Sequence, residues 1–129
     1  MITYWDSSAL IEAVFAPALR LRLEEERGVS RPHALAEVFS VLTGNPVTRI
    51  SADDAARVLE NLARHLDFVE LSAAEVLAAA KRARKCGVQG GRIHDFLHAV
   101  AAEKSLATRI LTLDKQDFSD LTKLEIEIA

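Results

Sequence analysis

The sequence has few residues that would cross-link, interrupt or loosen a chain. Its 129 residues include one cysteine, three prolines and five glycines. Because Cys86 has no second cysteine to pair with, an internal disulfide is excluded, and so is a metal site built only from thiolates. A single thiol is typical of a protein kept in a reducing cytoplasm. The shortage of proline and glycine argues against a long disordered linker.

Long apolar runs and an excess of basic charge are also missing. No stretch approaches the ~20 consecutive apolar residues of a membrane-spanning helix, and the first residues lack the pattern of a signal peptide. The 16 basic and 19 acidic residues give a net charge of −3, whereas nucleic-acid-binding proteins usually carry a basic excess. We therefore predict a cytoplasmic protein with no membrane segment, in which local charge matters more than the total.

What the chain does contain is enough apolar residues for one compact domain, residues 1–129, since 50% of it is hydrophobic. Strand-like and helix-like segments alternate along it. The strands are predicted at residues 2–5, 29–30, 68–71, 109–113 and 124–128, and the helices at residues 8–16, 18–26, 33–43, 52–65, 73–85 and 92–104. This alternation predicts an α/β sandwich around a mostly parallel sheet, with Tyr4 and Trp5 in the core.

Acidic residues stand where two of the predicted strands end. Asp6 directly follows the first strand, and Asp114 directly follows the strand at residues 109–113. Asp95 is in the first turn of the helix that leads into that second strand. In parallel sheets, ligands bind where the carboxyl ends of strands and the N-termini of connecting helices meet. Topology alone therefore predicts that the three carboxylates converge.

Each candidate acid also has an ordinary structural explanation. Asp6 is a suitable helix N-cap, Asp95 is a favourable charge at a helix N-terminus, and Asp114 fits a turn. Glu37 lies in the otherwise apolar segment 33–43, so it is either a solvent-facing residue or a buried functional carboxylate. Because capping and metal binding are compatible, the open question is whether each residue has a second role.

Clustered carboxylates repel one another, and a hard divalent cation removes that repulsion. Mg²⁺ and Mn²⁺ prefer oxygen ligands and retain several waters. Beside a phosphodiester, such an ion activates water and neutralises charge on the phosphate. Ser7, Ser8 and Thr112 are candidates to hold the acids or the waters in place.

Four stretches of the chain resemble motifs of the PIN-domain family, and specifically of its VapC-type ribonuclease toxins from VapBC toxin–antitoxin systems. They follow the family order across nearly the whole chain. The stretches are "DSSALI" at Asp6, "HALAEVFSVLT" around Glu37, "GGRIHDFLHAVAA" around Asp95 and "ILTLDKQDF" around Asp114. The resemblance implies a three-layer α/β/α sandwich with a mostly parallel sheet of about five strands.

The resemblance also implies a function. It indicates a metal-dependent endoribonuclease that cleaves RNA with a metal-activated water, forms a homodimer and is inhibited by a cognate VapB-type antitoxin. The implied catalytic acids are Asp6, Glu37, Asp95 and Asp114, of which Asp6, Asp95 and Asp114 would bind Mg²⁺ or Mn²⁺. Asp117 lies three residues after Asp114. It is a supporting residue or, alternatively, the fourth acid itself.

Three arginines are candidates for RNA contact. Arg82 and Arg84 belong to the basic run at residues 81–85. Such a run either binds phosphates or forms the solvated end of a helix. Arg92 lies closer in sequence to the predicted site.

Two other functions are compatible with the same residues. The stretch "HDFLH" spaces His94 and His98 as in the zinc-protease pattern H-E-x-x-H, so a zinc hydrolase is one alternative. Against it, Asp95 is one methylene shorter than the Glu of that pattern. The second alternative is a PIN-fold binding module without catalytic activity, although all four acids are present.

Overall fold

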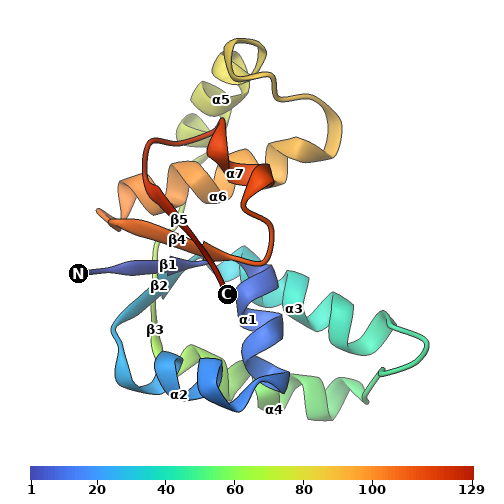
Figure 1. Ribbon diagram of the computed structural model, residues 1–129. Coiled ribbons are helices and arrows are strands. Elements are labelled where there is room, and N and C mark those ends of the chain that lie inside the picture. The colour runs from blue at the N-terminus through green and yellow to red at the C-terminus, as the bar shows by residue number, and fades with distance from the viewer.

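Five parallel strands form the centre of the molecule (Figure 1). The computed structural model describes residues 1–129. The strand order is β3-β2-β1-β4-β5, and every neighbouring pair is parallel. The strands are β1 (Thr3–Trp5), β2 (Gly28–Ser30), β3 (Leu66–Phe68), β4 (Arg109–Thr112) and β5 (Glu125–Ile128). The predicted parallel α/β architecture is confirmed.

Helices cover both faces of this sheet, so the molecule has three layers (Figure 1). One face carries α1 (Ser7–Phe15), α2 (Pro17–Glu25), α3 (Pro32–Gly44) and α4 (Ala52–Ala63). The other carries α5 (Ala73–Arg82), α6 (Ile93–Lys104) and α7 (Gln116–Ser119). Short 3₁₀ turns, Ala83–Cys86 and Gly90–Arg92, lie between α5 and α6. No helix has both the length and the apolar character that crossing a membrane requires.

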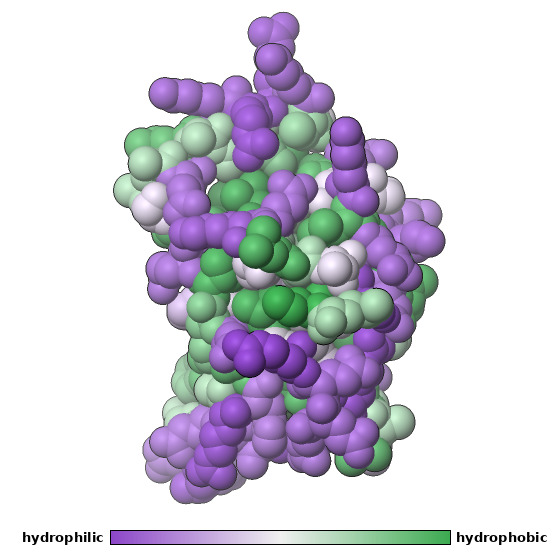
Figure 2. Space-filling model, turned by 90° about the vertical axis from the view of Figure 1, so that its left-hand side faces the viewer, coloured by the Kyte–Doolittle hydropathy of each residue, from purple (hydrophilic) through white to green (hydrophobic).

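The sheet divides the core into two parts because successive side chains of a strand point to opposite faces. Tyr4 and Ile110 belong to the apolar cluster beneath α6, whereas Trp5 and Leu111 belong to the cluster beneath α1 and α3. All four are fully buried. Figure 2 shows a band of hydrophobic residues across the middle of the molecule, with hydrophilic side chains above and below it. Burial on both faces explains why apolar residues stand side by side in β1 and β4, without alternation with polar ones.

The capping signals of α5 are formed as its sequence predicts. The hydroxyl of Ser72 accepts the N–H of Glu75 (3.1 Å), and the Glu75 carboxylate accepts the N–H of Ser72 (2.9 Å). The α-helix ends at Arg82, three residues before the predicted end, and continues as a 3₁₀ turn. Gly87 follows with a φ of 67°, a left-handed conformation that glycine adopts without a steric penalty.

Two predictions about secondary structure were wrong. The third strand was predicted at residues 68–71, but β3 covers Leu66–Phe68 because its partner β2 offers only three residues for pairing. Beyond it, the Val69 N–H still donates to the Ser30 carbonyl (2.8 Å). The second error is α7, which was not predicted because four residues are too few to show a helical period.

Candidate active site

Asp6 lies at the carboxyl end of β1, where it is the N-cap of α1 and only 5% exposed. Its Oδ1 accepts hydrogen bonds from the Ser8 hydroxyl (2.7 Å) and the Ala9 N–H (2.9 Å). Its Oδ2 accepts one from the hydroxyl of Thr112 (2.6 Å), the last residue of the adjacent strand β4. Capping is therefore one role of Asp6, and the same hydrogen bonds fix its carboxylate at the edge of the sheet.

Of the predicted supporting residues, Thr112 contacts Asp6 but Ser7 does not. The hydroxyl at position 8, not that at position 7, donates to the Asp6 carboxylate. Ser8 also lies 3.3 Å from the Thr112 hydroxyl and accepts the N–H of Leu113 (3.0 Å). These contacts join the start of α1 to the end of β4, so Ser8 is the one of the two candidate serines that holds the acid.

Asp95 is in the first turn of α6 and half-buried. Burial raises its pKa, and the negative charge of Asp117 raises it further. Smaller contributions in the same direction come from Asp6 and Glu37, while His98 lowers the pKa. Because these effects weaken with distance, Asp95 lies within electrostatic reach of the other acids.

Asp117 is the second acid that acts on this cluster. Burial raises its pKa, and the negative charge of Asp114 and a hydrogen bond with Asp114 raise it too. The positive charge of Arg92 lowers it, and Asp6 contributes a smaller increase. Asp117 belongs to α7, the helix absent from the predicted elements.

Asp114 has a different environment from Asp117. Its side chain is exposed, its Oδ1 accepts the Gln116 N–H (3.1 Å), and its own N–H donates to the Thr112 hydroxyl (3.1 Å). These contacts belong to the turn between β4 and α7. Among the charges that shift the pKa of Asp95, that of Asp117 has the largest effect. Of the two acids after β4, Asp117 is therefore the stronger candidate to act together with Asp95.

Glu37 is half-buried on α3, and a histidine from the opposite layer holds it. Nε2 of His98 lies 2.9 Å from Oε1 of Glu37, and Nδ1 of His98 lies 2.7 Å from the Tyr4 hydroxyl. Burial alone would raise the pKa of Glu37. The hydrogen bond from His98 and the positive charges nearby, including those of His33 and Arg31, together outweigh burial, so the pKa is lowered. Glu37 is thus not part of a purely solvent-facing stripe.

The geometry does not support the zinc interpretation of His94 and His98. Both ring nitrogens of His98 face a hydrogen-bond partner, so neither is free for a metal. The His94 ring instead stacks on His33, with centroids 6.1 Å apart and planes inclined by 16°. No group of three or more His, Cys, Asp or Glu side chains is arranged to hold a metal ion.

The oxygen donors at the sheet edge nevertheless fit a hard cation. Asp6, Asp95 and Asp117 supply carboxylates, and the raised pKa values of Asp95 and Asp117 indicate repulsion that a divalent cation would relieve. Mg²⁺ and Mn²⁺ are typically held by one or two protein carboxylates, with water completing the coordination. Such a site therefore does not need three convergent protein ligands.

The acids lie on an open edge of the molecule. None of the four cavities that the structure contains is lined by Asp6, Glu37, Asp95 or Asp117. A cavity of about 470 Å³ lies elsewhere, between β2, β3 and the end of α6.

The three candidate arginines lie at different places. Arg92 precedes α6 and acts electrostatically on Asp117, so it borders the acids. The guanidinium of Arg82 lies over the ring of Phe96, 5.5 Å from its centroid. Arg84 is exposed on the 3₁₀ turn that follows α5. Of the three, only Arg92 is positioned beside the candidate site.

The family of the chain follows from its sequence as a whole. A family model of the PIN domain matches residues 3–124. The chain belongs to the PIN-domain family. This confirms both the predicted family and the PIN-like sandwich fold. No curated protein sequence matches the chain.

Solved structures share the PIN fold along nearly the whole chain. VapBC2 from Rickettsia felis, bound to a promoter DNA fragment, is 17% identical, with a TM-score of 0.72 and coverage of 100% of this chain and 99% of that one. The protein PAE2754 from Pyrobaculum aerophilum is 19% identical, with a TM-score of 0.73 and coverage of 98% and 88%. VapBC-1 from nontypeable Haemophilus influenzae is 20% identical, with a TM-score of 0.71 and coverage of 99% and 98%. At these identities the similarity shows a common fold.

Two residues beside the acids of this PIN domain were missed as parts of the site. Tyr4 was expected only in the core. His98 entered the sequence analysis only as a zinc ligand. The sequence spacing could have placed both residues near the acids. Tyr4 on β1 is two residues before Asp6, and His98 is one helical turn after Asp95 on α6. The hydrogen bond from His98 to Glu37 has no such signal, since it joins residues 61 positions apart.

Proposed function

We propose that this PIN-domain protein is a VapC-type toxin, a cytoplasmic endoribonuclease that depends on Mg²⁺ or Mn²⁺ and cleaves RNA phosphodiester bonds. The observation that carries the proposal is the electrostatic coupling of Asp6, Glu37, Asp95 and Asp117 at one open edge of the sheet. Acids with raised pKa values at such an edge are typical of functional sites. Two of the similar structures are of VapBC proteins.

The residues have distinct roles in the proposed reaction. Asp6, fixed by three hydrogen bonds, Asp95 and Asp117 are the candidate ligands of Mg²⁺ or Mn²⁺, one or two of them binding directly and the rest through water. The ion would supply water activation and charge neutralisation at the phosphate. Glu37 is kept ionised by His98, which contacts only its Oε1. Its Oε2 is therefore the atom available to accept a proton from an attacking water.

The proposal includes a cognate VapB-type antitoxin and a homodimer. A ribonuclease without an inhibitor would damage the RNA of its own cell, so the toxin and the inhibitor would be made together. Four neighbouring carboxylates suggest how the inhibitor acts, because an arginine inserted among them would occupy the place of the cation. Arginine suits this role better than lysine, since its planar fork binds carboxylates in pairs.

The test is a cleavage assay on RNA from whole cells, with the purified chain and Mg²⁺ or Mn²⁺. We expect cleavage by the wild type, loss with a chelator, and a loss of at least about 100-fold in Asp6→Asn. Asp53→Asn is the matched control, because Asp53 is an exposed acid on α4. A folded wild-type chain that cleaves no RNA with either metal would instead support the inactive binding module.

The antitoxin is tested separately, by co-expression with the product of the neighbouring gene and affinity capture. We expect a complex with reduced cleavage activity, and growth arrest when the toxin is expressed alone. Asp6→Asn should relieve that arrest. If the lone wild-type chain is harmless and the neighbour's product neither binds nor inhibits it, the toxin assignment fails although the PIN family stands.

A further inference from the structure

A buried series of hydrogen bonds runs from the centre of the sheet to Glu37. The Tyr4 side chain on β1 is fully buried, and its hydroxyl lies 2.7 Å from Nδ1 of His98 on α6. Nε2 of the same ring lies 2.9 Å from Oε1 of Glu37 on α3. Because α3 and α6 cover opposite faces of the sheet, His98 reaches across the carboxyl edge from one layer to the other.

The chemistry of the three groups fixes which atom donates. An ionised carboxylate can only accept hydrogen bonds, so Nε2 of His98 must carry a proton to bond with Glu37. The Tyr4 phenol carries its proton at neutral pH, as phenols ordinarily do. It can therefore donate to Nδ1, which leaves both ring nitrogens of His98 satisfied and the ring plane fixed.

His98 itself cannot touch a substrate. It is 2% exposed, and its ring lies against that of Tyr4, with centroids 5.8 Å apart and planes inclined by 65°. Its neighbour Glu37 is only half-buried and has one carboxylate oxygen, Oε2, with no hydrogen-bond partner. The buried ring therefore holds one oxygen of the carboxylate and leaves the other without a hydrogen-bond partner.

We propose that His98, oriented by Tyr4, is a positioning residue that holds Oε1 of Glu37 and thereby directs Oε2 toward the reacting phosphate. This rests on the proposed ribonuclease function and adds two residues to it. Without the hydrogen bond, the Glu37 side chain would be free to change its rotamer, and the geometry for proton transfer would be lost more often. Binding of RNA would change little, because His98 and Tyr4 are buried.

The first test does not depend on activity. Nitrogen-15 NMR of the histidine side chains reports which ring nitrogen of His98 carries a proton. We expect a proton on Nε2, with a resonance that moves in Glu37→Gln, and an Nδ1 resonance that moves in Tyr4→Phe. A proton on Nδ1 alone would overturn the proposal, because Nε2 could not then donate to Glu37.

The second test measures kcat and KM separately on a short RNA oligonucleotide that the wild type cleaves. His98→Leu removes both hydrogen bonds and should lower kcat about 10- to 100-fold, the range for residues that orient a catalytic group, with KM within about twofold. His98→Gln keeps an N–H donor and an oxygen acceptor and should recover most of kcat. His65→Leu is the control, since the His65 side chain makes no hydrogen bond.

Three results would contradict the proposal: an unchanged kcat in His98→Leu, equal losses in His98→Leu and His98→Gln, or a loss that lies mainly in KM. If His98→Leu does not fold, His98→Gln and Tyr4→Phe nearly preserve side-chain volume and give the same comparison. If the wild type cleaves no RNA, the proposed function fails, and the NMR experiment alone decides whether His98 holds Glu37.

Discussion

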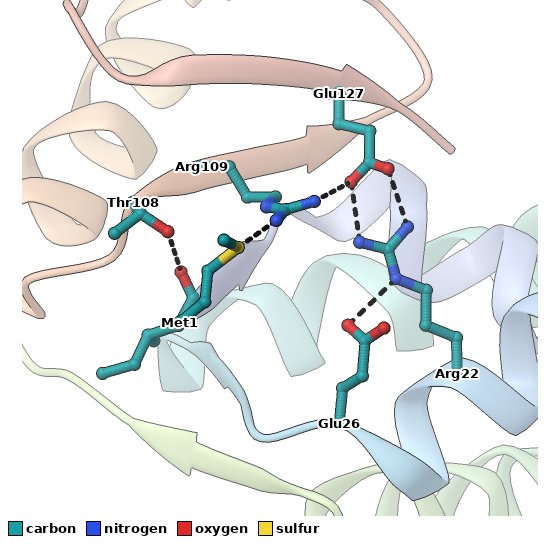
Figure 3. Close-up of polar contacts among 7 residues, drawn as sticks. Met1, Arg22, Glu26, Thr108, Arg109 and Glu127 are labelled. Carbon is teal, nitrogen blue, oxygen red and sulfur yellow. Dashed lines mark hydrogen bonds and ion pairs between the residues drawn. The ribbon is translucent and has the colours of Figure 1, made fainter.

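The acidic cluster at the carboxyl edge and the ion-pair network around Glu127 have opposite arrangements of charge. At the carboxyl edge, burial and the negative charge of Asp117 raise the pKa of Asp95, burial and the negative charge of Asp114 raise the pKa of Asp117, and no basic side chain forms an ion pair with either acid. Around Glu127, Arg22 donates two hydrogen bonds to the carboxylate (3.1 and 2.7 Å) and Arg109 donates a third (3.3 Å) (Figure 3).

This difference separates a stabilising ion-pair network from the candidate functional site. The hydrogen bond from Arg22 lowers the pKa of Glu127, and Glu127 in turn raises the pKa of Arg22. The pairing joins α2 to β4 and β5, so its effect is structural. The unpaired acids instead retain a net negative potential at an open edge, which is useful only if a cation or a cationic group binds there.

The largest expected effect is on RNA cleavage, when each of the two acids after β4 is replaced in turn by asparagine. Asp117→Asn should reduce RNA cleavage by at least about 100-fold, more than is usual for a residue that only supports a metal ligand. Asp114→Asn should reduce it less than about fivefold, because Asp114 is exposed in the turn and mainly stabilises the backbone there. Steady-state cleavage rates of the two folded variants decide between them, and the reverse ranking would restore Asp114 as the functional acid.

The next effect concerns stability at the ion-pair network. Glu127→Gln leaves Arg22 and Arg109, which are both partly buried, without their anionic partner. We expect a loss of about 1–2 kcal/mol in the free energy of unfolding at neutral pH, measured with denaturant. Glu125→Gln on the same strand is the control, because exposed Glu125 makes no ion pair.

The pH dependence of the stability lost in Glu127→Gln follows from the direction in which the Glu127 pKa is shifted. The folded pKa of Glu127 is lowered, so its contribution is fully present above the unfolded pKa of about 4.3. It is lost as the pH falls through the folded pKa. The wild type and Glu127→Gln should therefore converge in stability in acid, and a difference that persists there would show that the ion pair is not its cause.

Replacing Asp95 should change the free energy of unfolding in the opposite direction, by increasing it. Its folded pKa is raised, so the ionised form destabilises the fold above that pKa, and the penalty disappears below the unfolded pKa of about 3.9. Without metal, Asp95→Asn should gain less than about 1 kcal/mol at neutral pH, since the site is partly solvated. Added Mg²⁺ should stabilise the wild type more than the variant, as measured by thermal unfolding.

Asp6→Asn should not gain stability as Asp95→Asn does, because the Asp6 carboxylate accepts three hydrogen bonds. Asparagine still caps a helix, but its amide nitrogen would face the Thr112 hydroxyl. The expected cost is about 1 kcal/mol of unfolding free energy. A clear increase in stability would show that repulsion from Asp95 outweighs these hydrogen bonds.

The smallest effect should separate the candidate RNA-binding arginines. Arg92→Ala should raise KM for RNA about two- to fivefold and reduce the salt dependence of binding by about one phosphate contact. Arg84→Ala should change neither quantity, since Arg84 is exposed away from the acids. Binding titrations at several salt concentrations measure both, and equal effects would place RNA along the basic run instead.

Much of the fold was predictable because its signals are local. Apolar segments on each strand, the Ser72–Glu75 capping box and Gly87 each specify structure within a few residues. The position of β3 was not predictable from its own residues, since pairing with the three residues of β2 decides it. The convergence of Asp6 and Asp95 followed from parallel topology. The position of Asp117 did not, because it depends on a helix of four residues.

The contact between Asp6 and Thr112 spans 106 positions of the sequence, and this has a consequence for how the protein is made. The first strand lies at the centre of the sheet, between β2 and β4. During synthesis β1 and β2 are complete early, but β1 lacks its second neighbour until Arg109–Thr112 emerges. Closing such a long loop is slow compared with forming local helices. A nascent or prematurely terminated chain without β4 and α7 would have neither the Thr112 hydroxyl nor Asp117, so an assembled acidic edge would be present only in nearly complete molecules.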